Sequence, residues 1–216
     1  PLTAPLLAPW QGPYGGVPPF DRITPAALQP ALEAAMALQL EAIERIVTNP
    51  AAPDFANTIA ALEKSGRELD QAMTIFGIYT STLNDPAVQA VERELAPKLA
   101  AFNDRITQNE KLFARIAAVY AARERSALSS EQQRLTWLYY TNYVRAGASL
   151  DGKAKQRLSA INQRLASLYT SFSQNILAEE DGQALILAGE ADLAGLPDSL
   201  RAGAAAAAES RGQKGK

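Results

Sequence analysis

The stretch from Asp151 to Glu180, DGKAKQRLSAINQRLASLYTSFSQNILAEE, decides the fold of this chain. Its apolar residues recur at steps of three and four, at Leu158, Ile161, Leu165, Leu168, Phe172 and Ile176. This spacing marks one side of an α-helix, and about 30 residues at ~1.5 Å each make a helix ~45 Å long. We expect this helix to be the long spine of the domain and to end at Gly182.

The sequence before this stretch predicts five more helices, because apolar residues keep the same period between capping residues. Thr24 followed by Pro25 predicts a helix start, Asp85 caps a helix that contains Pro97, and Gly147 ends the helix with the densest aromatic residues. A proline inside a helix is expected to bend it. The predicted helices run over about 25–48, 57–82, 86–106, 110–120 and 130–146, and the second is expected to be interrupted softly at Gly66 and Gly77.

The two ends of the chain differ from this helical middle. Residues 1–24 hold six of the 13 prolines together with several glycines, which predicts an extended arm anchored by Leu6, Leu7, Trp10, Tyr14 and Phe20. After Gly182, the apolar segment from Gln183 to Ala188 is short and predicts a strand. A last short helix is expected from about Pro197 to Ser210.

The predicted fold is therefore mostly α: a multi-helix bundle of about six to seven helices, with an extended proline-rich N-terminal arm and one short C-terminal strand. We divide the chain into an arm (1–24), a helical domain (25–182) and a short strand, short helix and tail (183–216). A single strand is not a stable unit and the chain lacks an initial Met, so we expect the natural protein to extend beyond this sequence.

Composition excludes most common catalytic machinery. The 216 residues contain no Cys and no His, so the chain cannot form a disulfide, a zinc site of the usual nitrogen and sulfur type, or a Ser-His-Asp triad. The formal net charge is −2, which argues against nucleic acid as a partner. No apolar run approaches the ~20 residues that span a bilayer, so we expect no membrane partner.

Four groups of residues could carry chemistry, and each has a simpler structural explanation. The run Glu179, Glu180 and Asp181 could bind a hard cation, but its position favours a solvated helix terminus. The aromatic cluster Trp137, Leu138, Tyr139, Tyr140 and Tyr143 could line a ligand groove, but packing is favoured, with some rings buried and some exposed.

Hydroxyl and amide side chains of the long helix form the remaining two groups. Ser167, Ser171 and Ser173 have no base to activate them, so we expect contacts between helices. Asn175 is either a buried amide that fixes helix register or a flanking residue. We therefore predict no catalytic, cofactor-binding or metal residue in this chain.

Several phrases, spread in order over the whole chain, resemble the amino-terminal region of the thimet oligopeptidase family of zinc peptidases, most of all bacterial peptidyl-dipeptidases. They start with Pro5-Leu6-Leu7 and are otherwise GGVPPFD (15–21), FANTI (55–59), ALEKSG (61–66), ELAPKL (94–99), KLFARI (111–116), VRAGASL (144–150), FSQNIL (172–177) and LAGLP (193–197). The family's zinc site is an H-E-x-x-H helix with a further Glu, and no residue of that site can be placed on this histidine-free sequence.

The resemblance implies a channel-wall domain that lacks the zinc. Its partners would be the catalytic half of the same polypeptide and, in the longer protein, short peptide substrates; the chain alone is predicted to be inactive. The alternative is a free-standing helical module that binds a peptide or protein between its helices. The family resemblance is compatible with a cytoplasmic or a periplasmic location.

Overall fold

The computed structural model describes residues 3–14 and 16–214, apart from the side chain of Asp181, and in this part of the chain it is helical without any sheet. The predicted mostly α fold is confirmed. Contacts divide the chain into two compact units, Pro1–Ser171 and Phe172–Lys216. The predicted domain limits at Thr24 and Gly182 stay predictions. Among the described residues, no helix combines the length and the apolar character needed to cross a membrane.

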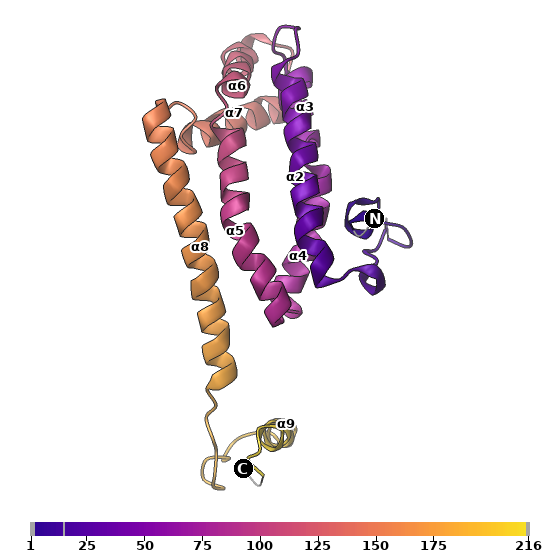
Figure 1. Cartoon of the computed structure of the whole chain (residues 1–216), viewed down its shortest axis with the longest axis vertical. Coiled ribbons are helices and arrows are strands. Elements are labelled where there is room, and N and C mark those ends of the chain that lie inside the picture. Colours follow the sequence, from indigo (N-terminus) through magenta and orange to yellow (C-terminus); the bar gives the residue numbers. More distant parts are fainter. Residues whose placement is uncertain (1–2, 15, 215–216) are drawn as a thin grey trace. The chain divides into compact units, whose positions relative to one another are not determined.

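The first unit is built around α2 (Pro25–Val47). This helix packs against α4 (Arg67–Thr82) and α5 (Pro86–Thr107), while α6 (Glu110–Ala122) and α7 (Ser130–Arg145) pack on each other at one end of the group (Figure 1). Large aliphatic side chains that fill this core without any exposed surface include Leu28, Leu32, Ile59, Ile75, Val88, Leu95, Leu112 and Ile116. Full burial of an aliphatic side chain contributes about 1.5–3 kcal/mol, so these contacts hold the unit together.

Capping residues start the helices where the sequence predicts. The side chains of Asp85, Asn109 and Ser129 accept hydrogen bonds from the backbone N–H groups of Val88, Leu112 and Gln132. Each bond satisfies a donor that the first helical turn leaves free. Thr24 differs, because α2 starts at Pro25 as expected but the Thr24 hydroxyl makes no capping bond.

The helix predicted over 57–82 is interrupted at Gly66 as expected, whereas α4 continues through Gly77, where a second interruption was predicted. The structure has three pieces there: the π-helix η2 (Phe55–Ile59), α3 (Ala60–Lys64) and α4. The break falls at Ser65 and Gly66, where the Ser65 hydroxyl donates to the Leu62 carbonyl. A Cβ on Gly66 would lie 2.8 Å from the amide nitrogen of Gln39 on α2, so the end of that flexible side chain would have to move to make room for it.

The arm is more ordered than predicted. It contains the short helix α1 (Ala4–Leu7) and the 3-10 turn η1 (Phe20–Arg22), so the expectation of a wholly non-helical arm is wrong. Leu6 is fully buried, and the Gln71 side chain donates to the Leu6 and Ala8 carbonyls at 3.0 and 2.7 Å. Tyr14 and Phe20 are exposed and are not anchors.

The helix predicted from Asp151 is confirmed as α8 (Gly152–Gly182). Within the second unit, the last turns of α8 are followed by a connecting segment and by α9 (Asp198–Ser210), which matches the predicted last helix. The strand predicted over 183–188 does not form in the described residues. The reason is physical: the backbone groups of a strand need a second strand, and the second unit offers none.

Candidate interaction surface

The aromatic cluster of α7 is mainly used for packing. Tyr143 is buried, and Tyr140 stacks on Tyr120 with ring centroids 4.0 Å apart. Trp137 is half-buried under the Arg134 guanidinium, whereas Leu138 is exposed. The predicted division into buried and exposed members is confirmed.

Two tyrosines of α7 hold their protons more tightly than free tyrosine. Burial raises the pKa of Tyr143 above its ordinary value, since a phenolate would lose its hydration. Burial also raises the pKa of Tyr139, and so does the hydrogen bond of 2.6 Å that its hydroxyl donates to Glu63 Oε1. Both side chains are therefore neutral near neutral pH, and Tyr139 serves as a hydrogen-bond donor.

The structure describes the side chains of two members of the acidic run at the end of α8. Glu179 and Glu180 are exposed, and the side chain of Asp181 lies outside the described residues. No group of three or more side chains with metal-binding capacity occurs in the part of the chain that the structure describes. The sequence supplies neither the imidazole nor the thiolate that zinc prefers, so the residues of this chain do not fit that metal.

The predicted roles of the α8 hydroxyls are wrong. Ser167 and Ser171 donate to the carbonyls of Gln163 and Ser167, one turn earlier in the same helix, and so do not join two helices. Ser173 is exposed, and so is Asn175, which settles the open question of that amide in favour of a flanking residue.

One side of α8 in the first unit faces the rest of that unit, and this side is polar. Asn162 donates from Nδ2 to Asp104 Oδ1 of α5 at 2.8 Å. The buried Lys155 ammonium lies 3.2 Å from Glu110 Oε1 of α6, and Thr170 is buried as well. This part of α8 therefore docks largely through charge and hydrogen bonds, with the half-buried Leu158 packed close to Gly147.

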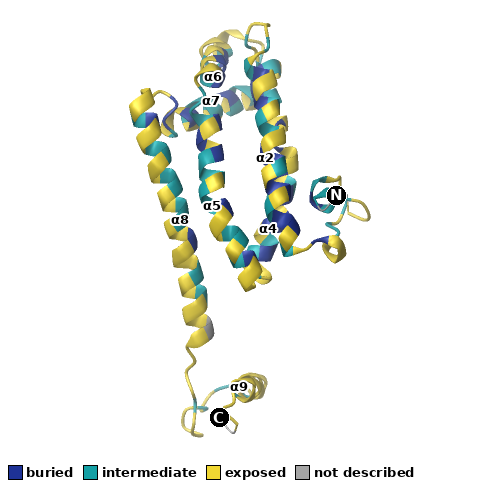
Figure 2. Ribbon diagram, in the orientation of Figure 1, coloured by how far each residue is buried: buried dark blue, intermediate teal, exposed yellow. Residues whose placement is uncertain are grey.

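The apolar side of the same helix is exposed, and Figure 2 shows that most of α8 is coloured as exposed. Ile161, Leu165 and Leu168, here called the α8 row, retain 37%, 41% and 46% of their exposure. At roughly 100° per residue, the row lies almost opposite the side that carries Thr170. The helix is about as long as predicted, but its apolar row is not part of the buried core.

The same spacing continues along the sequence into the second unit. Phe172 and Ile176 occupy the next positions of the pattern and are 63% and 44% exposed. Soluble proteins expose single apolar side chains freely, but a periodic row marks a binding surface. The α8 row is therefore the best candidate functional site of the chain.

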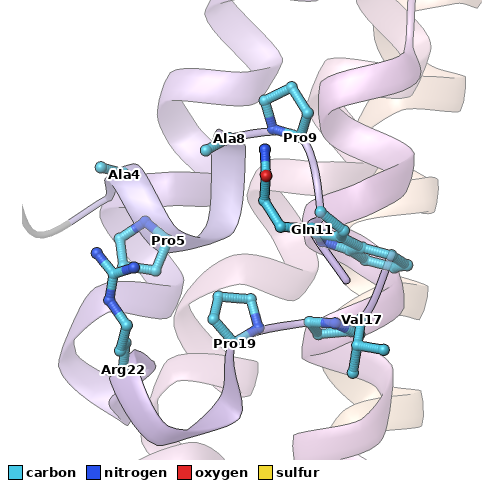
Figure 3. A pocket seen from close by; sticks show the side chains of 10 residues that line it. Ala4, Pro5, Ala8, Pro9, Gln11, Val17, Pro19 and Arg22 are labelled. Carbon is cyan, nitrogen blue, oxygen red and sulfur yellow. The ribbon is translucent and has the colours of Figure 1, made fainter. Parts of the chain in front are cut away.

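Two further hollows are less informative. The arm encloses a cavity of about 460 Å³ lined by residues between Ala4 and Arg22, mainly alanine and proline (Figure 3). The second unit has its own apolar hollow of about 220 Å³, formed by residues 184–187, Leu193 and one side of α9. Each hollow has arginine as its only charged side chain, so neither brings together an acid and a base.

Comparison with known proteins gives clear relatives. The chain is 36% identical over 208 residues to dipeptidyl carboxypeptidase of Salmonella typhimurium and 35% identical over 199 residues to that of Escherichia coli, which covers 96% and 92% of this chain. It is also 26% identical over 214 residues to oligopeptidase A of Escherichia coli. No family model matches the sequence.

These relatives define a class, the bacterial peptidases of dipeptidyl carboxypeptidase and oligopeptidase A type. The chain belongs to their family, the thimet oligopeptidase family, as its motifs predict. It spans about 30% of the length of the relatives that it matches. The greater part of each relative therefore has no counterpart in this sequence.

The sequence did not predict that the α8 row is exposed. Its residues were identified as one helical side, but the period alone does not say what that side faces. A signal was present at the positions that face the first unit, where α8 has Lys155, Asn162 and Thr170 instead of apolar residues. A helix that is polar on its docked side needs another partner for its apolar side.

Proposed function

We propose that this chain is the amino-terminal channel-wall part of a zinc peptidyl-dipeptidase or oligopeptidase that cleaves short peptides. One observation carries the proposal: almost the entire chain aligns with dipeptidyl carboxypeptidases that are about three times longer. The remaining polypeptide would supply the zinc site and the catalytic residues. The role of this part is steric, because a narrow channel admits an extended peptide and excludes folded proteins.

The α8 row supports the same proposal from the structure. A wall domain must be attached to the catalytic part through a surface that it does not cover itself. Ile161, Leu165 and Leu168 provide such a surface. We expect the rest of the polypeptide to bury them, and each fully buried side chain would contribute about 1.5–3 kcal/mol to the association.

A free-standing interaction module would expose a similar row. The two proposals differ in what the row binds: the rest of the same polypeptide in one case, a separate protein in the other. They also differ in activity, because a module has no catalytic part to complete.

A chimaera separates these proposals. In it, this chain replaces the matching 208-residue region of the Salmonella typhimurium dipeptidyl carboxypeptidase. We expect the chimaera to bind zinc and to release dipeptides, whereas the isolated chain does neither. An inactive but folded, zinc-loaded chimaera would contradict the wall proposal, and so would stoichiometric zinc with peptidase activity in the isolated chain.

The control uses two leucines of similar exposure. Leu165 is 41% exposed and Leu38, on α2, is 43% exposed. In the chimaera, Leu165→Glu should reduce dipeptide release and domain attachment more than Leu38→Glu does, because only the first places a charge in the proposed contact.

A further inference from the structure

Along most of its length, α8 carries charges of one sign only. Between Gly152 and Ala178 the helix carries Lys153, Lys155, Arg157 and Arg164 but no acidic residue. Lys155 is paired with Glu110. For the other three cations, no carboxylate partner is found among the side chains that the structure describes. Such unpaired cations beside an apolar row indicate the charge of its partner.

Two of these cations lie beside the α8 row. Arg157 and Arg164 are seven residues apart, which is almost two helical turns, so they share one flank of the helix. Arg164 directly precedes Leu165 of the row, and both arginines are exposed. In coiled coils, two helices recognise each other through apolar positions flanked by charges that repeat every seven residues, and α8 has this arrangement.

The spacing of the row supports a helix as the partner. The apolar residues from Leu158 to Phe172 alternate steps of three and four, and this gives the narrow seam of a helix pair. Helices that lie on membranes use a broad apolar side that is often rich in Trp and Phe. Here Ala166 and Ser167 follow Leu165, and no Trp occurs on α8, so the seam stays narrow.

We propose that the α8 row binds an amphipathic helix with acidic residues along the edge that faces Arg157 and Arg164. The inference rests on the proposed function in one respect: the acidic helix is supplied by the part of the longer polypeptide that this chain lacks. The apolar seam provides the affinity, and the two arginines select the partner and its register.

The experiment uses the chain of 216 residues and two designed helical peptides of three heptads. Both peptides carry Leu at the a and d positions; one has Glu and the other has Lys at every e and g position. Like charges at these positions keep each peptide from pairing with itself. We expect the Glu peptide to bind about tenfold more tightly than the Lys peptide at low salt, and the difference to shrink at high salt.

Variants assign the binding to the row and to the arginines. Leu165→Glu should abolish binding of both peptides, whereas Leu38→Glu on α2 should leave it unchanged. The double variant R157E/R164E should fold normally, because both side chains are exposed, and should prefer the Lys peptide. Circular dichroism of each variant confirms the helical fold independently of binding.

Three outcomes would overturn the inference: equal binding of the two peptides, binding of phosphatidylserine vesicles without binding of the Glu peptide, or self-association of the chain through Leu165 that prevents peptide binding. None of them depends on peptidase activity. An active chimaera together with any of these results would leave the wall proposal standing and reject the acidic helix.

Discussion

The two longest helices of the molecule, α2 and α8, have similar apolar patterns and opposite environments. In α2, Leu28 and Leu32 are fully buried between α4 and α5. In α8, Leu165 and Leu168 keep more than 40% of their exposure, while Asn162 and Lys155 make the contacts to the first unit. The comparison teaches that an amphipathic period predicts a helix with an apolar side, but not that the same chain covers that side.

The largest expected difference between the two helices is in how much the free energy of unfolding falls when a leucine is replaced by alanine. Leu32→Ala should lower the free energy of unfolding by about 2–5 kcal/mol, because it leaves a cavity among fully buried neighbours. Leu165→Ala should change it by less than about 0.5 kcal/mol. Urea unfolding followed by circular dichroism measures both. Similar losses for the two variants would show that α8 contributes to the core of the isolated chain.

A second comparison concerns two arginines. Arg115 is buried, and its guanidinium donates to the carbonyls of Asn49 and Ala51 and to Asn57 Oδ1 at 2.8–3.2 Å. Arg115→Met should cost about 1–3 kcal/mol, because part-buried acceptors lose their donor. Arg164→Met on α8 should cost almost nothing. If urea unfolding gave the two variants equal stability, the Arg115 bonds would not hold α6 to the segment after α2.

The third comparison is between two tyrosines in alkaline solution. The folded-state pKa of Tyr143 lies above its ordinary value near 10 because burial disfavours the phenolate. The unfolded chain therefore ionises first, so this contribution to stability is complete below about pH 10 and is lost as the pH rises further. We expect a decline of about 1.4 kcal/mol per pH unit for each such tyrosine.

Phenylalanine substitution isolates that contribution. Urea unfolding between pH 9 and 11 should show a shallower decline for Tyr143→Phe. Tyr169→Phe is the matched control on α8. The Tyr169 ring is 67% exposed in the folded chain, so unfolding changes its contact with water much less than that of the Tyr143 ring. An unchanged slope for Tyr143→Phe would contradict burial of that ring.

Much of the fold could be predicted from the sequence because helix starts depend on local chemistry. Asp85, Asn109 and Ser129 cap helices at the predicted places, and the α8 period predicted its bounds to within two residues. Those signals involve only neighbouring residues. The class of peptidase was also readable, because its phrases run through the whole chain.

Errors arose where structure depends on distant partners. The short helix of the arm was missed, and the arm is held by the burial of Leu6 and by hydrogen bonds from Gln71, which is distant in the sequence. The segment 183–188 does not form a strand because the described residues of the second unit offer no partner strand with which it could pair. The exposure of the α8 row was missed for a related reason, because the apolar period does not say which surface that side of the helix faces.

Thiol labelling at position 165 tests most directly whether the rest of the longer polypeptide buries the α8 row. The chain has no cysteine, so Leu165→Cys introduces one thiol. The measurement compares the labelling rate of the peptide that contains residue 165, by mass spectrometry, in the isolated chain and in the chimaera with the Salmonella typhimurium enzyme. We predict fast labelling in the isolated chain and strong protection in the chimaera. Equal rates in the two proteins would contradict the account.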